Sequence, residues 1–241
     1  MSPLALVSVS NKTNIVPFCK NLIEKFDYKI LSSGGTAQFL TDAKIPVIKV
    51  SDFTNSPEIL EGRVKTLHPK IHGGILAKRL NKKHQKDLEK NKIELIDLVV
   101  VNLYPFKRKV EEHCTWEEAI ENIDIGGPSM IRSAAKNHKY VSVLVDPAQY
   151  NYFIKELELG SLKEEYKSKL ACEAFLHTAD YDTAIAKWMC REKDLIASKH
   201  IDSYPLTKIL RYGENPHQKA LWYGLDNVGW SSAQQLQGKE L

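Results

Sequence analysis

Long apolar runs, closely spaced cysteines and a large excess of either charge are all missing from this 241-residue sequence. No stretch approaches the roughly 18 apolar residues that a transmembrane helix needs. The N-terminus, "MSPLALVSVSNK", has no charged segment followed by a long apolar one. We therefore expect neither a membrane span nor a signal peptide.

The cysteines are few and scattered. Cys19, Cys114, Cys172 and Cys190 form no C-x-x-C pair. This spacing favours free thiols in a reducing compartment over a disulfide framework or a zinc site. We expect a cytoplasmic protein with no bound metal.

The net charge is small, because 34 Lys and Arg residues face 30 Asp and Glu residues. A dedicated nucleic-acid binder usually concentrates more positive charge. The hydrophobic fraction of 43% is ordinary for a soluble protein with a real core. The composition points to a small anionic ligand, held by a few local charges, rather than to nucleic acid.

Short apolar runs rich in β-branched residues occur at 4–10, 28–33, 45–50, 96–106 and 141–146. They are nearly continuous rather than alternating, which is typical of strands buried on both faces of a sheet. Between them lie helical patterns, at 14–26 and 36–43, and two charged segments expected to be exposed helices, at 82–91 and 115–122. This alternation predicts an α/β fold with a mostly parallel sheet.

Residues 147–193 are predicted to be helical, with a long helix over 162–189. Its predicted core-facing stripe is Leu170, Phe175, Ala179 and Ile185. Proline and glycine become frequent from about residue 195. We therefore predict a first domain over 1–195 and a second segment over 196–241, which is too short to bury a core of its own.

Polar and glycine-rich loops follow three of the predicted strands: "SVSNKT", "SSGGT" and "NLYPF". In parallel sheets, ligands bind at the carboxyl ends of the strands, so these loops are expected to line one pocket. Gly34 and Gly35 allow close approach of an anion, and Ser33, Thr36, Ser10 and Lys12 can supply donors beside a helix N-terminus. Taken singly, each loop also fits an ordinary turn.

The segment 61–79, "EGRVKTLHPKIHGGILAKR", carries a second candidate wall. In an extended chain, Arg63 and Lys65 point to one side and Thr66 to the other. Arg63 suits phosphate binding, and Lys65 suits charge or proton handling. His68 and His72 have the spacing of a metal pair, but Pro69 intervenes and no third ligand is evident, so we expect supporting roles for both.

The segment 122–138, "NIDIGGPSMIRSAAKNH", places an acid and a lysine on either side of a glycine turn. Asp124 and Lys136 could form a general acid–base pair. Asp124 could equally cap a helix whose Arg132 and Lys136 face solvent. Tyr104, in "NLYPF", could donate a proton or simply pack.

Several motifs together resemble the family of bifunctional purine biosynthesis proteins, which join an inosine monophosphate (IMP) cyclohydrolase domain to an aminoimidazole carboxamide ribonucleotide (AICAR) formyltransferase domain. They are "SVSNKT", "SSGGTA", "EGRVKTLHPKIHGGILA", "VNLYPF", "IDIGGPSMIRSAAKNH", "AFLHTADYD" and "LRYGENPHQ", in the family's order. The resemblance covers nearly the whole chain. It implies a methylglyoxal-synthase-like α/β fold for the first domain.

The resemblance implies that formyl-AICAR closes its ring to IMP with loss of water, without a metal or redox cofactor. By resemblance, Asp124 polarises or deprotonates the carboxamide, Lys136 donates and accepts protons, and Lys65 and Tyr104 support the developing oxyanion. The implied nucleotide-binding residues are Ser10, Asn11, Lys12, Ser33, Gly34, Gly35, Thr36, Arg63, Val64, Thr66, Val101, Asn102, Ile125 and Gly126.

The family's proteins are longer than this chain, and only the start of their second domain is present. Arg211, Tyr212 and His217 match positions of the family's AICAR site. The Lys–His pair of the formyltransferase, which uses 10-formyltetrahydrofolate, is absent, so we do not expect formyl transfer from this chain alone. The family forms homodimers, largely through the second domain.

Two other interpretations use the same fold. Methylglyoxal synthase also binds a phosphate monoester, but it lacks "KTLHP" and "RSAAKNH". A non-catalytic nucleotide-sensing module could keep the phosphate cradle without the lysines and the aspartate. The joint presence of Lys65, Tyr104, Asp124 and Lys136 favours catalysis.

Overall fold

The computed structural model of the chain describes residues 2–112, 114–160, 162–225, 229, 233 and 236–238. The chain divides into two compact units, 1–189 and 190–241. The predicted second segment began nearby, at 196, and part of its end lies outside the described residues. Among the described helices, none is both long and apolar enough to cross a membrane.

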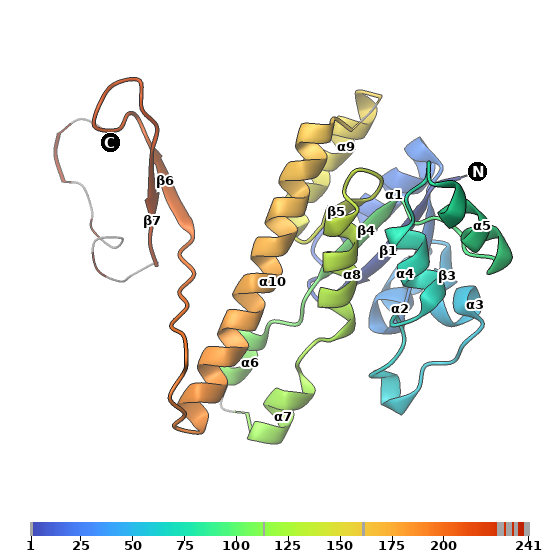
Figure 1. The fold of residues 1–241 in the computed structure, drawn as a ribbon, viewed down its shortest axis with the longest axis horizontal. Coiled ribbons are helices and arrows are strands. Elements are labelled where there is room, and N and C mark those ends of the chain that lie inside the picture. The colour runs from blue at the N-terminus through green and yellow to red at the C-terminus, as the bar shows by residue number, and fades with distance from the viewer. Residues whose placement is uncertain are drawn as a thin grey trace. The chain divides into compact units, whose positions relative to one another are not determined.

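The first unit is built on a parallel sheet of five strands, ordered β3-β2-β1-β4-β5 (Figure 1). The strands are β1 (Leu4–Val9), β2 (Lys29–Ser32), β3 (Val47–Lys49), β4 (Leu98–Asn102) and β5 (Ser142–Leu144). Each lies within one of the five predicted apolar runs, and every pairing is parallel. The predicted α/β fold is confirmed.

Helices cover both faces of this sheet. The helices of this unit are α1 (Ile15–Phe26), α2 (Gly34–Asp42), α3 (Val50–Thr54), α4 (Pro69–Leu76), α5 (Lys82–Lys90), α6 (Phe106–Glu111), α7 (Trp116–Glu121), α8 (Gly126–Lys136), α9 (Tyr150–Glu158) and α10 (Glu164–Glu192). Along β1, Leu4 and Leu6 pack toward α4, α8 and α10, whereas Ala5 and Val7 pack toward α1, α2 and α9. Both faces are therefore dry, which explains the near-continuous apolar runs.

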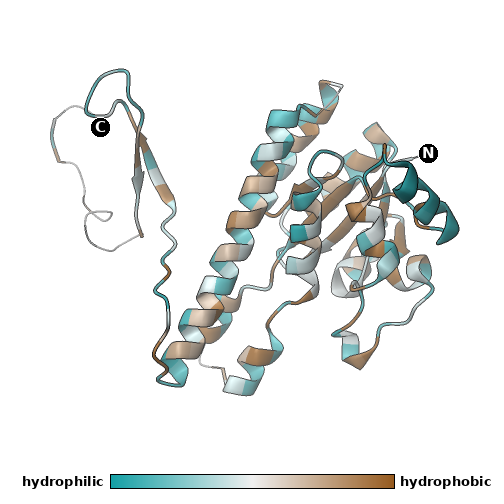
Figure 2. Ribbon diagram, in the orientation of Figure 1, coloured by the Kyte–Doolittle hydropathy of each residue, from teal (hydrophilic) through white to brown (hydrophobic). Residues whose placement is uncertain are grey.

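The helix α5 is the hydrophilic exception. Figure 2 shows it as largely hydrophilic, and it buries no residue. Asn81 caps it by accepting hydrogen bonds from the N–H groups of Lys83 and His84. The expectation of an exposed, charged helix at 82–91 is confirmed.

The long helix α10 corrects the predicted stripe. Leu170 is buried and Ile185 is half-buried, but Phe175 and Ala179 are exposed. The helix instead buries Ala171, Ala174, Thr178, Tyr181 and Trp188. Ala171, Ala174 and Thr178 let the first half of this face pack closely, and Tyr181 and Trp188 fill the space along its second half, while Phe175 lies outside this contact.

The second unit contains an antiparallel pair, β6 (Leu206–Leu210) and β7 (Ala220–Tyr223). The turn between them is closed by the N–H of Gly213, which donates to the carbonyl oxygen of Gln218 at 2.8 Å. Arg211, Tyr212 and His217 lie in this turn, and all three are exposed. Two strands alone bury little apolar surface, in line with the short length of this segment.

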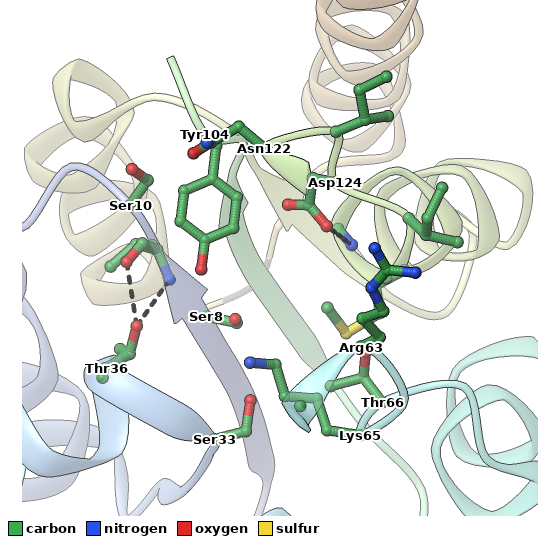
Figure 3. Close-up of a pocket in the computed structure, with 18 of the residues that line it drawn as sticks. Ser8, Ser10, Ser33, Thr36, Arg63, Lys65, Thr66, Tyr104, Asn122 and Asp124 are labelled. Atoms are coloured by element: carbon green, nitrogen blue, oxygen red, sulfur yellow. Dashed lines mark hydrogen bonds between the residues drawn. The ribbon is translucent and has the colours of Figure 1, made fainter. Parts of the chain in front are cut away.

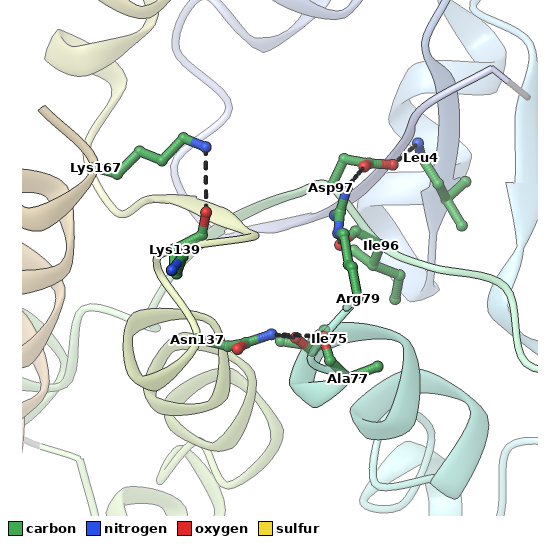
Figure 4. A network of polar contacts seen from close by, with 9 residues as sticks. All are labelled: Leu4, Ile75, Ala77, Arg79, Ile96, Asp97, Asn137, Lys139 and Lys167. Carbon is green, nitrogen blue, oxygen red and sulfur yellow. Dashed lines mark hydrogen bonds and ion pairs between the residues drawn. The ribbon is translucent and has the colours of Figure 1, made fainter. Parts of the chain in front are cut away.

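Polar contacts join the layers at the amino ends of the strands (Figure 4). The Asp97 carboxylate accepts from the N–H of Leu4 and pairs with Arg79, each at 2.8 Å. The buried Asn137 amide donates to the carbonyl oxygens of Ile75 (2.7 Å) and Ala77 (3.1 Å). Asn137 thereby satisfies carbonyl groups at the end of α4 that no helical partner can reach.

Replacing Asn137 with alanine should lower the free energy of unfolding by about 1–3 kcal/mol, because two buried carbonyl groups would lose their donor. Urea unfolding measures the effect. Asn91→Ala is the matched control, since the Asn91 amide also donates to a carbonyl oxygen, that of Asp87, but is exposed. It should cost less than about 0.5 kcal/mol. Equal losses in the two variants would contradict the role given to Asn137.

Candidate functional site

A pocket of about 770 Å³ lies at the carboxyl ends of β1, β2 and β4, within the usual size range of small-molecule sites. Thirteen predicted residues line it: Ser10, Lys12, Ser33, Gly35, Thr36, Arg63, Lys65, Thr66, Asn102, Tyr104, Asp124, Ile125 and Gly126. The loops after these three strands therefore meet in one place, as the strand-end argument predicts.

One side of the pocket is built around Thr36, in the first turn of α2. Its hydroxyl accepts from the N–H of Val9 (3.1 Å) and donates to the carbonyl oxygen of Val9 (3.0 Å), which ties α2 to β1. The Lys12 ammonium donates to the Thr36 hydroxyl at 3.0 Å and also to the Val9 carbonyl. Burial lowers the pKa of Lys12. This cation is held rigidly at the pocket wall.

Ser33 precedes α2 and faces the same space (Figure 3). Its hydroxyl is buried and has no hydrogen-bond partner in the described part of the chain. A buried hydroxyl without a partner is costly, so a ligand that bonds it gains more than an exposed contact would give. Together with the free N–H groups at the start of α2, Ser33 makes a suitable site for an oxyanion.

Asn102, at the end of β4, shapes the loop after β1. Its side-chain oxygen accepts from the N–H groups of Ser10 (2.7 Å) and Asn11 (2.8 Å). Its amide donates back to the Asn11 carbonyl at 3.3 Å. Asn102 therefore holds the loop that carries Lys12, in addition to lining the pocket.

The segment 59–66 forms a tight turn, which corrects the extended chain predicted there. Leu60, Glu61 and Gly62 all have positive φ angles. As a result, Arg63, Lys65 and Thr66 all line the pocket instead of pointing to opposite sides. Figure 3 shows Lys65 pointing into the pocket from this turn, and Tyr104 pointing into it from the other side.

Arg63 forms an ion pair across the pocket. Its guanidinium contacts the carboxylate of Glu121, with one hydrogen bond of 3.0 Å from Nε to Oε1. The pairing raises the pKa of Arg63 and lowers that of Glu121, in both cases mainly through the side-chain hydrogen bond. Both side chains are exposed, so the pair contributes little to stability.

Asp124 combines the two roles that the sequence left open. Its carboxylate accepts from the N–H of Gly127 at 2.8 Å, which caps the start of α8, and it also lines the pocket. Burial raises the pKa of Asp124, while the Gly127 hydrogen bond and the positive charge of Lys65 oppose the rise. A half-buried carboxyl group near a lysine is suited to proton transfer.

Five predicted residues do not line the pocket. Lys136 is exposed at the last residue of α8, about 15 Å along the helix axis from Gly126 at 1.5 Å per residue. The structure does not bring Asp124 and Lys136 together, because the two glycines open a helix that carries Lys136 away from the pocket. Val101 points into the core. The others are Asn11, Gly34 and Val64.

Gly34 and Val64 nonetheless support the site. Gly34 has a positive φ angle, and a Cβ there would lie 3.2 Å from the Lys65 ammonium. Glycine therefore allows Lys65 to approach the start of α2. The backbone of Val64 pairs with that of Ile59 and closes the 59–64 turn.

The sequence argument missed several lining residues: Ser8, Val9, Glu61, Gly62, Ile120, Glu121, Asn122, Ile123, Gly127 and Met130. Ser8 carried a usable signal, because side chains two apart on a strand share a face and Ser10 was already a candidate. The residues at the end of α7 show no such signal in the sequence, since only the three-dimensional fold brings that helix to the pocket.

Neither His68 nor His72 lies in the pocket. The ring of His68 accepts from the N–H of Lys70 at 3.1 Å and caps α4. The ring of His72 contacts the Ser133 hydroxyl at 3.1 Å. The described residues contain no group of three or more His, Cys, Asp or Glu able to hold a metal ion, and all four cysteines are free thiols.

Two glycines at matching helix positions offer a test of this packing. A Cβ at Gly127 would lie 2.4 Å from Asp124 and 2.6 Å from Leu103, whereas a Cβ at Gly35 would meet nothing within 4 Å. Gly127→Ala should therefore lower the free energy of unfolding by about 1–3 kcal/mol. Gly35→Ala should raise it by up to about 1 kcal/mol. Urea unfolding of both variants checks the contrast, and a neutral Gly127→Ala would refute the tight fit around Asp124.

Comparison with known families agrees with this architecture. The family model described as "MGS-like domain" matches residues 14–129. The model described as "AICARFT/IMPCHase bienzyme" matches residues 134–241. Together they span almost the whole chain.

Curated relatives match over the full chain. The bifunctional purine biosynthesis protein PurH of Prochlorococcus marinus strain MIT 9301 is 75% identical over 241 residues, and that of strain MIT 9515 is 74% identical. Each match covers 100% of this chain and 47% of the relative. The chain thus spans about half the length of these relatives.

A solved structure is also similar. The crystal structure of ForH superposes with a TM-score of 0.68 at 33% sequence identity, covering 77% of this chain and 98% of that one. The chain belongs to the family of the bifunctional purine biosynthesis protein PurH, whose N-terminal part it matches.

Proposed function

We propose that this chain is an IMP cyclohydrolase, which closes the ring of formyl-AICAR to IMP with loss of water. The observation that carries the proposal is that one pocket combines an anion-binding wall, made by Lys12, Ser33 and the start of α2, with the half-buried acid Asp124 and the nearby charge of Lys65. A purine nucleotide precursor needs both halves at once: a grip on its phosphate and proton transfer at its base.

The anion-binding wall is suited to the ribose phosphate. The N–H groups at the start of α2 and the partner-free hydroxyl of Ser33 can donate to phosphate oxygens. Lys12 adds a positive charge at the same end. This grip leaves the base to reach toward Asp124, Lys65 and Tyr104.

The chemical step follows from the other side of the pocket. The carboxamide nitrogen attacks the formyl carbon, a C–N bond forms, and the formyl oxygen becomes an oxyanion beside Lys65. Asp124 takes a proton from the attacking nitrogen and passes it to the oxyanion, which becomes a hydroxyl group. The formamide nitrogen then loses its proton to Asp124 and forms a C=N bond as the C–O bond breaks. The raised pKa of Asp124 lets it transfer this second proton to the hydroxyl group, which leaves as water. Lys65 stabilises the oxyanion by charge and hydrogen bonding.

Lys136 has no part in this scheme, because it lies at the far end of α8. We expect ring closure to need no metal or redox cofactor, since every step is proton transfer or addition–elimination. We do not propose formyl transfer for this chain. A role in binding AICAR stays a prediction for Arg211, Tyr212 and His217, which match positions of the family's AICAR site.

Lys12→Ala should weaken IMP binding by about 10- to 100-fold, since a charge-assisted hydrogen bond to phosphate contributes about 1.5–3 kcal/mol. Titration calorimetry with IMP measures the change. Lys86→Ala, on the exposed helix α5, removes the same charge away from the pocket and should leave the affinity unchanged. Equal affinities in the wild type and Lys12→Ala would remove Lys12 from the phosphate site.

Formyl-AICAR added to the purified chain should yield IMP, followed by its ultraviolet absorbance. Turnover should rise with pH as Asp124 ionises, at a pH above the ordinary range of aspartate, because burial raises its pKa. Asp124→Asn should lower kcat at least about 100-fold and abolish that rise. A folded wild-type chain that binds IMP without turning over formyl-AICAR would instead indicate a nucleotide-sensing module.

A further inference from the structure

The motif "AFLHTADYD" lies in α10, outside the lining of the pocket, yet one of its side chains reaches the loop that carries Asp124. The Tyr181 hydroxyl accepts from the backbone N–H of Asp124 at 2.8 Å. It also donates to the carbonyl oxygen of Asn122 at 3.4 Å. Both hydrogen bonds fix the backbone at and just before Asp124, the residue whose carboxyl group takes part in the proposed reaction.

The ring of Tyr181 is fixed by an aromatic cluster. It packs edge-on against Phe106, at 6.3 Å between ring centroids. Phe106 packs edge-on against Trp188, which stacks on Trp116 at 4.6 Å. Tyr181 and Trp188 lie two turns apart on α10, so this helix holds the beginnings of both α6 and α7.

The loop between α7 and α8 makes few other hydrogen bonds to distant parts of the described chain. Its described backbone bonds are to near neighbours, such as the N–H of Ile123 to the carbonyl oxygen of Ile120 at 3.1 Å. The Gly127 N–H fixes the Asp124 carboxylate relative to α8. Tyr181 as a whole residue is only 8% exposed, and its hydroxyl fixes the backbone of Asp124 to a distant part of the chain.

We propose that Tyr181 is a positioning residue for Asp124. Its hydroxyl holds the backbone of 122–124 so that the Asp124 carboxyl group stays buried and faces Lys65. This inference rests on the proposed function only in the role that it gives to Asp124. The fixed geometry itself is a separate claim, and it can be measured without turnover.

The charges around the pair are few. The charge of Lys65, in the 59–66 turn, lowers the pKa of Asp124. Asp182 and Tyr104 raise the pKa of the Tyr181 hydroxyl. Burial is the main cause of the raised pKa of Asp124. If the loop loosened and water entered, that pKa would fall toward the ordinary value for aspartate.

Tyr181→Phe keeps the aromatic packing and removes only the hydroxyl. In the full chain, kcat for ring closure should fall about 10-fold, the effect of losing one well-placed hydrogen bond at a catalytic loop. KM and the affinity for IMP should stay within about twofold, because the phosphate grip lies on the other wall. Tyr166→Phe, on the same helix but packed in the opposite core, is the control and should match the wild type.

A ¹³C NMR titration of the Asp124 carboxyl group gives the second measurement. In Tyr181→Phe its pKa should move down relative to the wild type and to Tyr166→Phe. An unchanged kcat together with an unchanged Asp124 titration would overturn the proposal, even if the variant were less stable to urea. A wild type without turnover would refute the cyclohydrolase assignment and leave the titration to decide the positioning role.

Discussion

Parallel pairing of β1 with β2 on one side and β4 on the other is the constraint on which the rest of the structure depends. Ala5 lies opposite both Ile30 and Leu98, so the three strands run in step and end at one edge. The loops that follow must then meet, and Asn102 can reach the backbone of Ser10 and Asn11. A slip of one residue would exchange the two faces to which the β1 side chains point and would move the loop that carries Ser10 out of step with its neighbours.

The pocket separates two electrostatic tasks. The start of α2, Ser33 and Lys12 offer donors and positive charge to an anion. Across the pocket, Asp124 is half-buried, and this partial burial favours its protonated form. One wall thus stabilises a permanent charge, while the other makes a proton exchangeable. This division fits the proposed reaction, which takes place on an uncharged ring attached to a phosphate.

The sequence predicted the sheet because its strands are buried on both faces, which leaves a strong local pattern. It predicted the wall that carries Lys12, Ser33 and Thr36 because strand-end loops are also local, whereas Ile125 and Gly126 came from the resemblance to the family. It failed where the outcome depends on packing. Leu60 and Glu61 adopt positive φ angles, although neither is a glycine or an asparagine. Lys136 lies far from the pocket because the helix that carries it already begins at Gly126. Ser8 was overlooked although its spacing from Ser10 placed it on the same face.

The ion pair between Arg63 and Glu121 has a consequence for ligand exchange. Both side chains line the pocket, so a phosphate or oxyanion that approaches Arg63 meets a carboxylate already bound there. For an anion to bind at this point, it has to replace the carboxylate of Glu121, so the ion pair is an internal competitor that lowers affinity and favours release. In the proposed function, this competition would speed the departure of the product.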